Sequence, residues 1–204
     1  MTDFNITQFS KRLIPILFVF FLVDVSSVGA QRFKGSAVFG LNLAQIDGDD
    51  LAGFSKLGWT GGVKLGYPMR DNVDINLEML YSQRGSIDGF GFGSQSVNYT
   101  DLKYLEIPVY ANIMDWFIAD EGYHKVKAHA GLNFSYLFAV DSSNGAVSND
   151  IDTYNRKNIG YLLGVDYMFT KHLGTSVRYS RAFNSILESN AISYWVTIRT
   201  EYSF

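Results

Sequence analysis

Three histidines are the residues that most directly suggest catalysis in this 204-residue sequence. His124 and His129 are close in the chain, whereas His172 is far from both. An imidazole becomes a general base or a metal ligand when other polar groups converge on it. Neither an HExxH nor a GxSxG motif is present, and there is no cysteine. We therefore expect the histidines to be structural.

Two segments are rich in carboxylates, "IDGDDLAGF" from residue 46 and the region 141–152. Their acidic residues are Asp47, Asp49, Asp50, Asp141, Asp150 and Asp152. Oxygen donors at this density can hold Ca²⁺ or bridge lipopolysaccharide through divalent ions, but the spacing does not follow the EF-hand pattern. We expect solvated loop charges, with no metal and no cofactor.

A glycine-rich segment, "GSIDGFGFGSQS", carries Phe90 and Phe92. Exposed aromatic rings on such a loop would form a contact surface for a partner. The alternative is that the loop folds both rings over the structure beneath it.

The first thirty residues have the features of a secretory signal peptide. Lys11 and Arg12 precede the apolar run "LIPILFVFFLV", and the small residues Gly29 and Ala30 suit a signal peptidase. The run is short for a membrane-spanning helix, which needs about 20 residues. We expect cleavage after Ala30 following Sec-type export, with an uncleaved anchor as the alternative.

The remaining chain, 31–204, shows a period of two in nearly every segment and no long helical period. Ile75, Leu77 and Met79, for example, alternate with Asn76 and Glu78. Continuing this pattern predicts eight strands in a single domain. Their expected ranges are 33–45, 57–67, 73–84, 102–114, 124–139, 158–169, 173–183 and 191–204.

The connections between these strands alternate in length. Four long ones, 46–56, 85–101, 140–157 and 184–190, would lie at one end, and 68–72, 115–123 and 170–172 at the other. Long extracellular loops and mostly tight periplasmic turns are typical of outer-membrane barrels. Both termini would then lie at the periplasmic end.

Apolar and polar residues alternate in both membrane and soluble barrels. The composition of the polar face is therefore what distinguishes them. A water-exposed exterior would be rich in Lys and Glu. The polar face of this chain instead carries mostly small residues, such as Gly62, Gly164 and Ser176. Small residues fit the narrow interior of an eight-stranded barrel. The opposite face carries aromatic residues near strand ends, including Trp59, as in the girdles of membrane barrels.

Strand parity places nine charged residues in the interior of this barrel. They are Lys64, Asp74, Glu78, Glu106, Lys127, Asp166, Arg178, Arg199 and Glu201. Four bases and five acids in so narrow a lumen predict a paired network that fills it, because an unpaired buried charge is costly. A selectivity lining of a narrow channel is the alternative.

The chain ends in "TIRTEYSF", where Tyr202 and Phe204 lie on the apolar face. A final strand in lipid must pair with the first strand to satisfy its edge. The terminal aromatic also resembles the signal by which the barrel-assembly machinery recognises its substrates.

Several segments together resemble the PorT-like outer membrane protein beta-barrel family. They are "YLEIPVYANI" at 104–113, "AGLNFSYLFA" at 130–139, "GYLLGVDYMF" at 160–169 and the closing "TIRTEYSF". The resemblance implies a small eight-stranded barrel of the outer membrane. The founding member's link to protein secretion is carried by no particular residue here.

The sequence thus predicts an all-β fold, an eight-stranded antiparallel up-and-down transmembrane β-barrel of the outer membrane, preceded by a cleaved signal peptide. We expect a non-enzymatic protein whose partners are outer-membrane lipid, lipopolysaccharide, the assembly machinery and a secretion or envelope protein. The net charge of −3 argues against a nucleic-acid partner. A narrow channel, a secretion subunit and a lipid-modifying enzyme remain alternatives.

Overall fold

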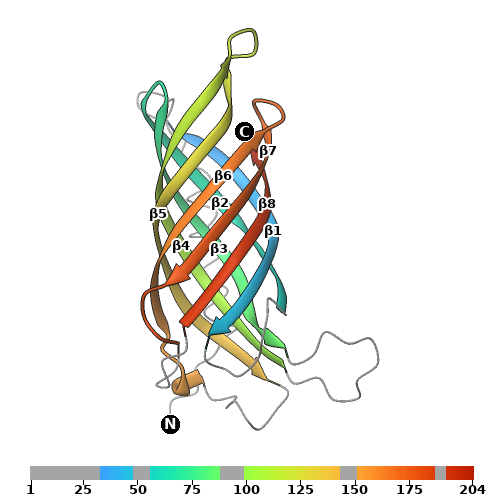
Figure 1. Cartoon of the computed structure of the whole chain (residues 1–204), viewed down its shortest axis with the longest axis vertical. Helices are drawn as coiled ribbons and strands as arrows, with labels where there is room; N and C mark the ends of the chain where they lie inside the picture. Colours follow the sequence, from blue (N-terminus) through green and yellow to red (C-terminus); the bar gives the residue numbers. More distant parts are fainter. Residues whose placement is uncertain (1–32, 48–55, 88–98, 143–150, 187–191) are drawn as a thin grey trace, which may run out of the picture. The chain divides into compact units, whose positions relative to one another are not determined.

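The computed structural model describes residues 33–47, 56–87, 99–142, 151–186 and 192–204. They form a closed barrel in which each strand pairs antiparallel with the next, and β8 pairs with β1 (Figure 1). The predicted eight-stranded up-and-down topology is therefore confirmed. The expected signal peptide, 1–30, lies outside the described residues.

The strands are close to their predicted ranges. Their bounds are β1 (Lys34–Asp47), β2 (Lys56–Arg70), β3 (Val73–Ile87), β4 (Tyr99–Ile118), β5 (Tyr123–Ser142), β6 (Lys157–Met168), β7 (Leu173–Ala182) and β8 (Ile192–Ser203). A short 3-10 helix, η2 (Ile151–Thr153), precedes β6. No helix in the described part of the chain is long and apolar enough to cross a membrane.

Burial alternates along the strands as the period of two predicts. In β3, Asn76 and Glu78 are buried, whereas Ile75, Leu77 and Met79 are 37%, 46% and 56% exposed. The polar side chains therefore face inward and the large apolar side chains face outward. This arrangement is the reverse of a water-soluble barrel and suits a barrel surrounded by hydrocarbon.

The two ends of the barrel differ. At the end that we call the turn end, short turns join β2 to β3, β4 to β5 and β6 to β7, and β8 finishes (Figure 1). There the Ser203 amide donates to the His172 carbonyl, and the Phe204 amide donates to the Gly35 carbonyl. The longer connections lie at the opposite end, which we call the loop end.

The hairpin of β4 and β5 corrects one prediction. The connection expected at 115–123 is mostly strand, because pairing continues from Asp115↔Val126 to Ile118↔Tyr123. The turn itself is closed by Gly122, at φ +69°, whose amide donates to the Ile118 carbonyl. The hairpin therefore extends beyond the other two at the turn end (Figure 1).

Candidate functional site

The lumen contains the charged residues that strand parity places inside. Eight of the nine predicted residues are buried, and Lys127 is half-buried. Six of them take part in separate ion pairs at different positions in the barrel, namely Lys64, Glu78, Glu106, Arg178, Arg199 and Glu201. Asp74 has a local partner, since Asn76 Nδ2 donates to its carboxylate.

Glu78, on β3, is the carboxylate with the most cationic partners. Arg178 Nη1 and Arg199 Nη1 lie 2.9 Å and 2.8 Å from its Oε2. The Tyr110 hydroxyl also donates to Glu78. The two arginines are on β7 and β8, which lie across the barrel from β3. Closure of the barrel therefore brings them to Glu78. The side chains thus cross the lumen.

Glycine makes room for Arg199 where the backbones of β1 and β8 approach closely. A Cβ placed on Gly40 would lie 2.4 Å from Arg199 Cβ, which is too close for any side chain. The small residues noted in the sequence therefore allow long side chains from facing strands to occupy the interior, as expected in a narrow barrel.

A second ion pair joins Lys64 on β2 to Glu201 on β8. The hydroxyl of Ser36, on β1 between them, donates to Glu201 Oε1 at 3.0 Å. Both charged side chains are buried, with exposed fractions of 4% and 3%. This pair links the first two strands to the last strand and therefore supports closure of the barrel.

His129 lies in the lumen between a guanidinium and a carboxylate. Arg178 Nε donates to His129 Nε2 at 3.2 Å, and His129 Nδ1 lies 3.2 Å from Asp166 Oδ1. With Nε2 accepting, the proton of the neutral ring resides on Nδ1 and faces Asp166. A nitrogen that accepts from an arginine is not free to act as a general base. The geometry gives His129 a structural role.

The other two histidines lie elsewhere. His124 packs its ring against Phe117 in the extended hairpin, with the ring centroids 4.9 Å apart. His172 Nδ1 lies 2.8 Å from the Ser203 carbonyl oxygen at the turn end. The structure therefore brings none of the three histidines together.

Arg84 is a lumen residue that the sequence reasoning missed. Its Nε donates to Glu106 Oε1 at 3.0 Å, and its Nη2 donates to Ser135 at 3.1 Å. The guanidinium carbon lies 3.3 Å from the ring centroid of Trp195. Arg84 shares the parity of Glu78, so extending the inward face to the end of β3 would have found it.

The nine predicted residues together with Arg84 carry equal numbers of bases and acids. The predicted count of four bases against five acids becomes five against five. The bases are Lys64, Arg84, Lys127, Arg178 and Arg199, and the acids are Asp74, Glu78, Glu106, Asp166 and Glu201.

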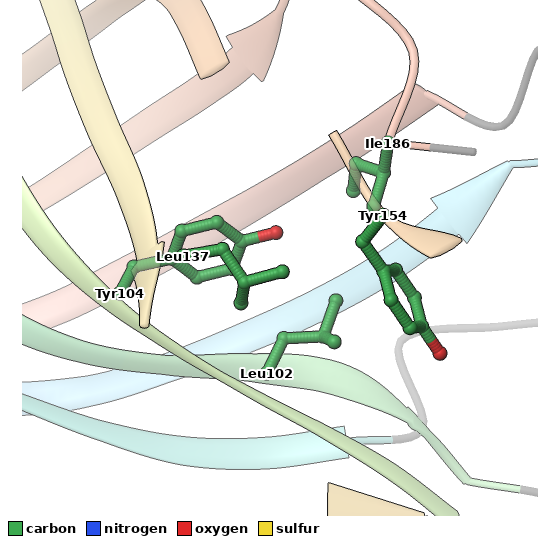
Figure 2. Close-up of a cluster of buried hydrophobic side chains, with 5 residues drawn as sticks. All are labelled: Leu102, Tyr104, Leu137, Tyr154 and Ile186. Carbon is green, nitrogen blue, oxygen red and sulfur yellow. The ribbon is translucent and has the colours of Figure 1, made fainter. Parts of the chain in front are cut away.

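A cluster of buried apolar side chains lies toward the loop end of the barrel. Figure 2 shows this cluster, in which Leu102, Tyr104 and Leu137 from β4 and β5 meet Tyr154 and Ile186 from the connecting segments. The Leu137 amide donates to the Arg156 carbonyl, and the Asn155 amide donates to the Ile186 carbonyl. These backbone bonds hold the connecting segments against the barrel. We call this cluster the apolar cap.

Two residues outside the strands, Tyr154 in the cap and Arg156 next to it, have shifted pKa values. Burial raises the pKa of Tyr154. Hydrogen bonds to Tyr136 and Asp152 raise the pKa of the exposed Arg156. Asp152 therefore takes part in an ion pair with Arg156. Neither shift marks a group poised for proton transfer near neutral pH.

The other predicted contact residues are only partly described. Asp141 is exposed, whereas Phe90, Phe92, Asp49, Asp50, Asp150 and the side chain of Asp47 lie outside the described part of the chain. Within that part, no group of three His, Cys, Asp or Glu side chains could hold a metal ion. At the other end, Tyr202 and Phe204 are 52% and 78% exposed on the outer surface.

The chain matches a known protein family over residues 27–188, which is most of its length. Together with the closed barrel, this match defines a small integral protein of the outer membrane. The chain belongs to the family described as Outer membrane protein beta-barrel domain. Among curated proteins, no sequence matches it.

Solved structures with the same fold include Ail, the attachment invasion locus protein of Yersinia pestis, crystallised with the heparin analogue sucrose octasulfate. It has a TM-score of 0.50 and 14% identity, over 85% of this chain and 99% of Ail. Neisserial surface protein A has a TM-score of 0.48 and 18% identity, over 84% of this chain and 97% of its own. At 14% identity the likeness to Ail shows the fold alone.

Proposed function

We propose that this protein is a non-enzymatic outer-membrane barrel with a lumen closed by side chains. The observation that carries the proposal is the Glu78 carboxylate, which accepts from two arginines of β7 and β8 across the lumen. The Arg84–Glu106 pair and the apolar cap fill the interior toward the loop end. Function then resides in the outer surface and the extracellular loops, which bind a partner or support envelope integrity.

Planar-bilayer recording of the purified protein tests the closed lumen. We expect the wild-type protein to show no steady conductance, because paired charges and apolar side chains leave no continuous water path. Steady open events in the wild type would contradict the proposal and would favour a narrow channel. The exposed variant Asp152→Asn serves as a control, since it changes charge outside the lumen.

The non-enzymatic assignment is supported by the separation of the three histidines. A lipid-modifying enzyme would need His with Ser or Asp at one accessible site. A triple variant tests this alternative, with His124, His129 and His172 each replaced by Gln. Its envelope lipids are then compared with those of the wild type. An altered lipid composition in a strain whose variant barrel is folded would contradict the proposal.

We further propose that residues 1–30 are removed after Sec-type export and that the turn end lies in the periplasm. The alternating lengths of the connections support this orientation. Sequencing the N-terminus of the protein from outer membranes should give Gln31 as the first residue. A sequence beginning at Met1 would instead show an uncleaved anchor.

The PorT-like resemblance adds a finer proposal, that the loops contact a component of a secretion or envelope complex. The segment "YLEIP", in β4, is the most specific element of this resemblance, although no particular residue carries the secretion role. Crosslinking in intact outer membranes, followed by mild detergent extraction, should recover one protein in constant proportion to the barrel. Recovery of the barrel alone would argue against a stable complex.

A further inference from the structure

A groove on the outer surface of β4, β5 and β6 has no role in the closed lumen. It has a volume of about 540 Å³ and is lined mainly by apolar side chains. These are Ala111, Ile113, Ala128, Ala130, Leu163 and Val165. Cavities of this size are typical of sites that hold a small molecule.

The groove arises because alanines replace large residues at adjacent outward positions. Ala111 pairs with Ala130, and Ala130 pairs with Leu163 on the next strand. Ile113 and Val165, which are 62% and 52% exposed, stand on either side of Ala128. Elsewhere the outer face carries bulkier residues such as Leu77 and Met79. The alanine floor is therefore a local depression in an otherwise apolar wall.

A lysine lies beyond the groove toward the turn end. Lys125 precedes Val126 along β5, three residues from Ala128, which is about 10 Å in a strand. Its strand parity is that of the inward-facing Lys127, but its side chain reaches Tyr167, whose ring is exposed on the outer face. Its Nζ lies 5.1 Å from the ring centroid of Trp116 and 5.5 Å from that of Tyr167. Tyr167 is on β6 and pairs with Val126 on β5. Lys125 and the groove therefore share the same strands.

The surroundings of Lys125 leave its charge available. Among the described residues, no carboxylate lies within salt-bridge distance of its Nζ. Asp115, on the adjacent strand, has its Oδ1 engaged by the Trp116 amide at 2.7 Å. Lysine between aromatic rings at a strand end is suited to the boundary between hydrocarbon and headgroups.

We propose that this surface binds one molecule of an anionic glycerophospholipid. An acyl chain lies over Ala128 and Ala130, and the phosphate contacts Lys125. Water exclusion does not drive binding within hydrocarbon, so selectivity comes from the fit of the chain to the depression and from charge attraction at the interface. The inference goes beyond the closed-lumen function and does not depend on whether the barrel conducts.

Native mass spectrometry of the full protein from outer membranes tests the proposal. The protein is released from detergent in the presence of either dioleoyl phosphatidylglycerol or dioleoyl phosphatidylcholine. We expect one retained phosphatidylglycerol molecule and less phosphatidylcholine. Equal retention of the two lipids, or a protein dimer in place of the lipid-bound monomer, would overturn the proposal.

Filling the groove should remove the lipid. In the double variant Ala128→Leu with Ala130→Leu, the retained fraction should fall about tenfold. The matched control is Ala37→Leu, an exposed outward position on β1, which should leave retention unchanged. If the double variant does not assemble, Ala130→Leu alone carries the same expectation. Equal retention by the groove variant and the control would overturn the proposal.

The headgroup contact has its own test. Lys125→Gln should lower phosphatidylglycerol retention about fivefold, which corresponds to about 1 kcal/mol for one basic residue near an anionic headgroup. It should leave phosphatidylcholine retention unchanged. Lys171→Gln, an exposed position at the turn end, removes the same charge away from the groove. An equal loss in both lysine variants would show nonspecific attraction and would overturn the assignment of Lys125.

Discussion

Glu78 accepts hydrogen bonds from two arginines that are 100 and 121 residues away in the sequence. Two arginines and one carboxylate leave an excess positive charge at this point. Asp166 adds a negative charge nearby, because it contacts His129, which in turn accepts from Arg178. The Tyr110 hydroxyl donates to the same carboxylate. Such a buried cluster constrains the relative positions of β3, β7 and β8, because its members are satisfied only in one arrangement.

Replacing Glu78 with Gln should destabilise the barrel strongly. The variant leaves Arg178 and Arg199 buried without their carboxylate, and removing one partner of a buried pair costs about 3–5 kcal/mol. Urea unfolding of the protein in micelles, followed by tryptophan fluorescence, measures the loss. The control Asp152→Asn breaks an exposed pair and should leave the free energy of unfolding nearly unchanged. Equal losses in the two variants would contradict the importance of the lumen network.

Arg84 and Glu106 allow a sharper test of pairing. Arg84→Leu should cost about 3 kcal/mol, because it leaves the Glu106 carboxylate buried without its cation. The double variant with Glu106→Leu should recover most of this loss, since an apolar pair can replace a buried ion pair. The free energies of unfolding of both single variants and the double variant complete the cycle. Additive losses would show that the two residues act independently.

At the scale of elements, β8 both closes the barrel and ends the chain. It pairs with β1 from Ser36↔Ser203 to Asp47↔Ile192, and the Phe204 amide bonds to Gly35 beyond the strand. The Phe204 ring is 78% exposed, so it contributes little to packing. We propose that the assembly machinery contacts this ring before the barrel inserts.

We expect Phe204→Ala to reduce the amount of barrel assembled in outer membranes severalfold. Refolding of the purified variant into micelles should be unchanged, because the backbone bond to Gly35 remains and the ring is exposed. Phe183→Ala, an exposed aromatic just after β7, is the matched control and should assemble normally. A similar loss for both variants would argue against a specific terminal signal.

The period-two pattern predicted the strands because lipid outside and polar side chains inside require alternation. It ended β4 at residue 114, since Asp115, Trp116 and Phe117 extend past β3 in a hairpin with β5, where that requirement no longer applies. Parity identified the inward residues but not their partners. Pairing of Glu78 with Arg178 depends on how far the strands are staggered around the barrel, which no local pattern encodes.

The apolar cap was not predicted for a related reason. Leu102 and Leu137 belong to strands, but Tyr154 and Ile186 come from connections that have no periodicity. Their positions depend on backbone bonds such as Asn155 to Ile186. The cap therefore appears only when the two connections are seen together (Figure 2).

For the whole molecule, we propose that the barrel wall separates two environments. The outer face would meet hydrocarbon at residues such as Met79, and the inner face would be a dry, paired interior at residues such as Ser82, which is 1% exposed. A water-filled pore would place water at the inner face. A soluble protein would place water at the outer face.

The most direct test is the labelling rate of single cysteines by a charged, water-soluble thiosulfonate in intact outer membranes. The chain has no cysteine, so each variant reports one site. We expect Asp141→Cys, an exposed position at the loop end, to react rapidly, and Ser82→Cys and Met79→Cys to remain unmodified. Rapid labelling of Ser82→Cys would contradict the closed lumen, and rapid labelling of Met79→Cys would contradict the lipid-facing wall.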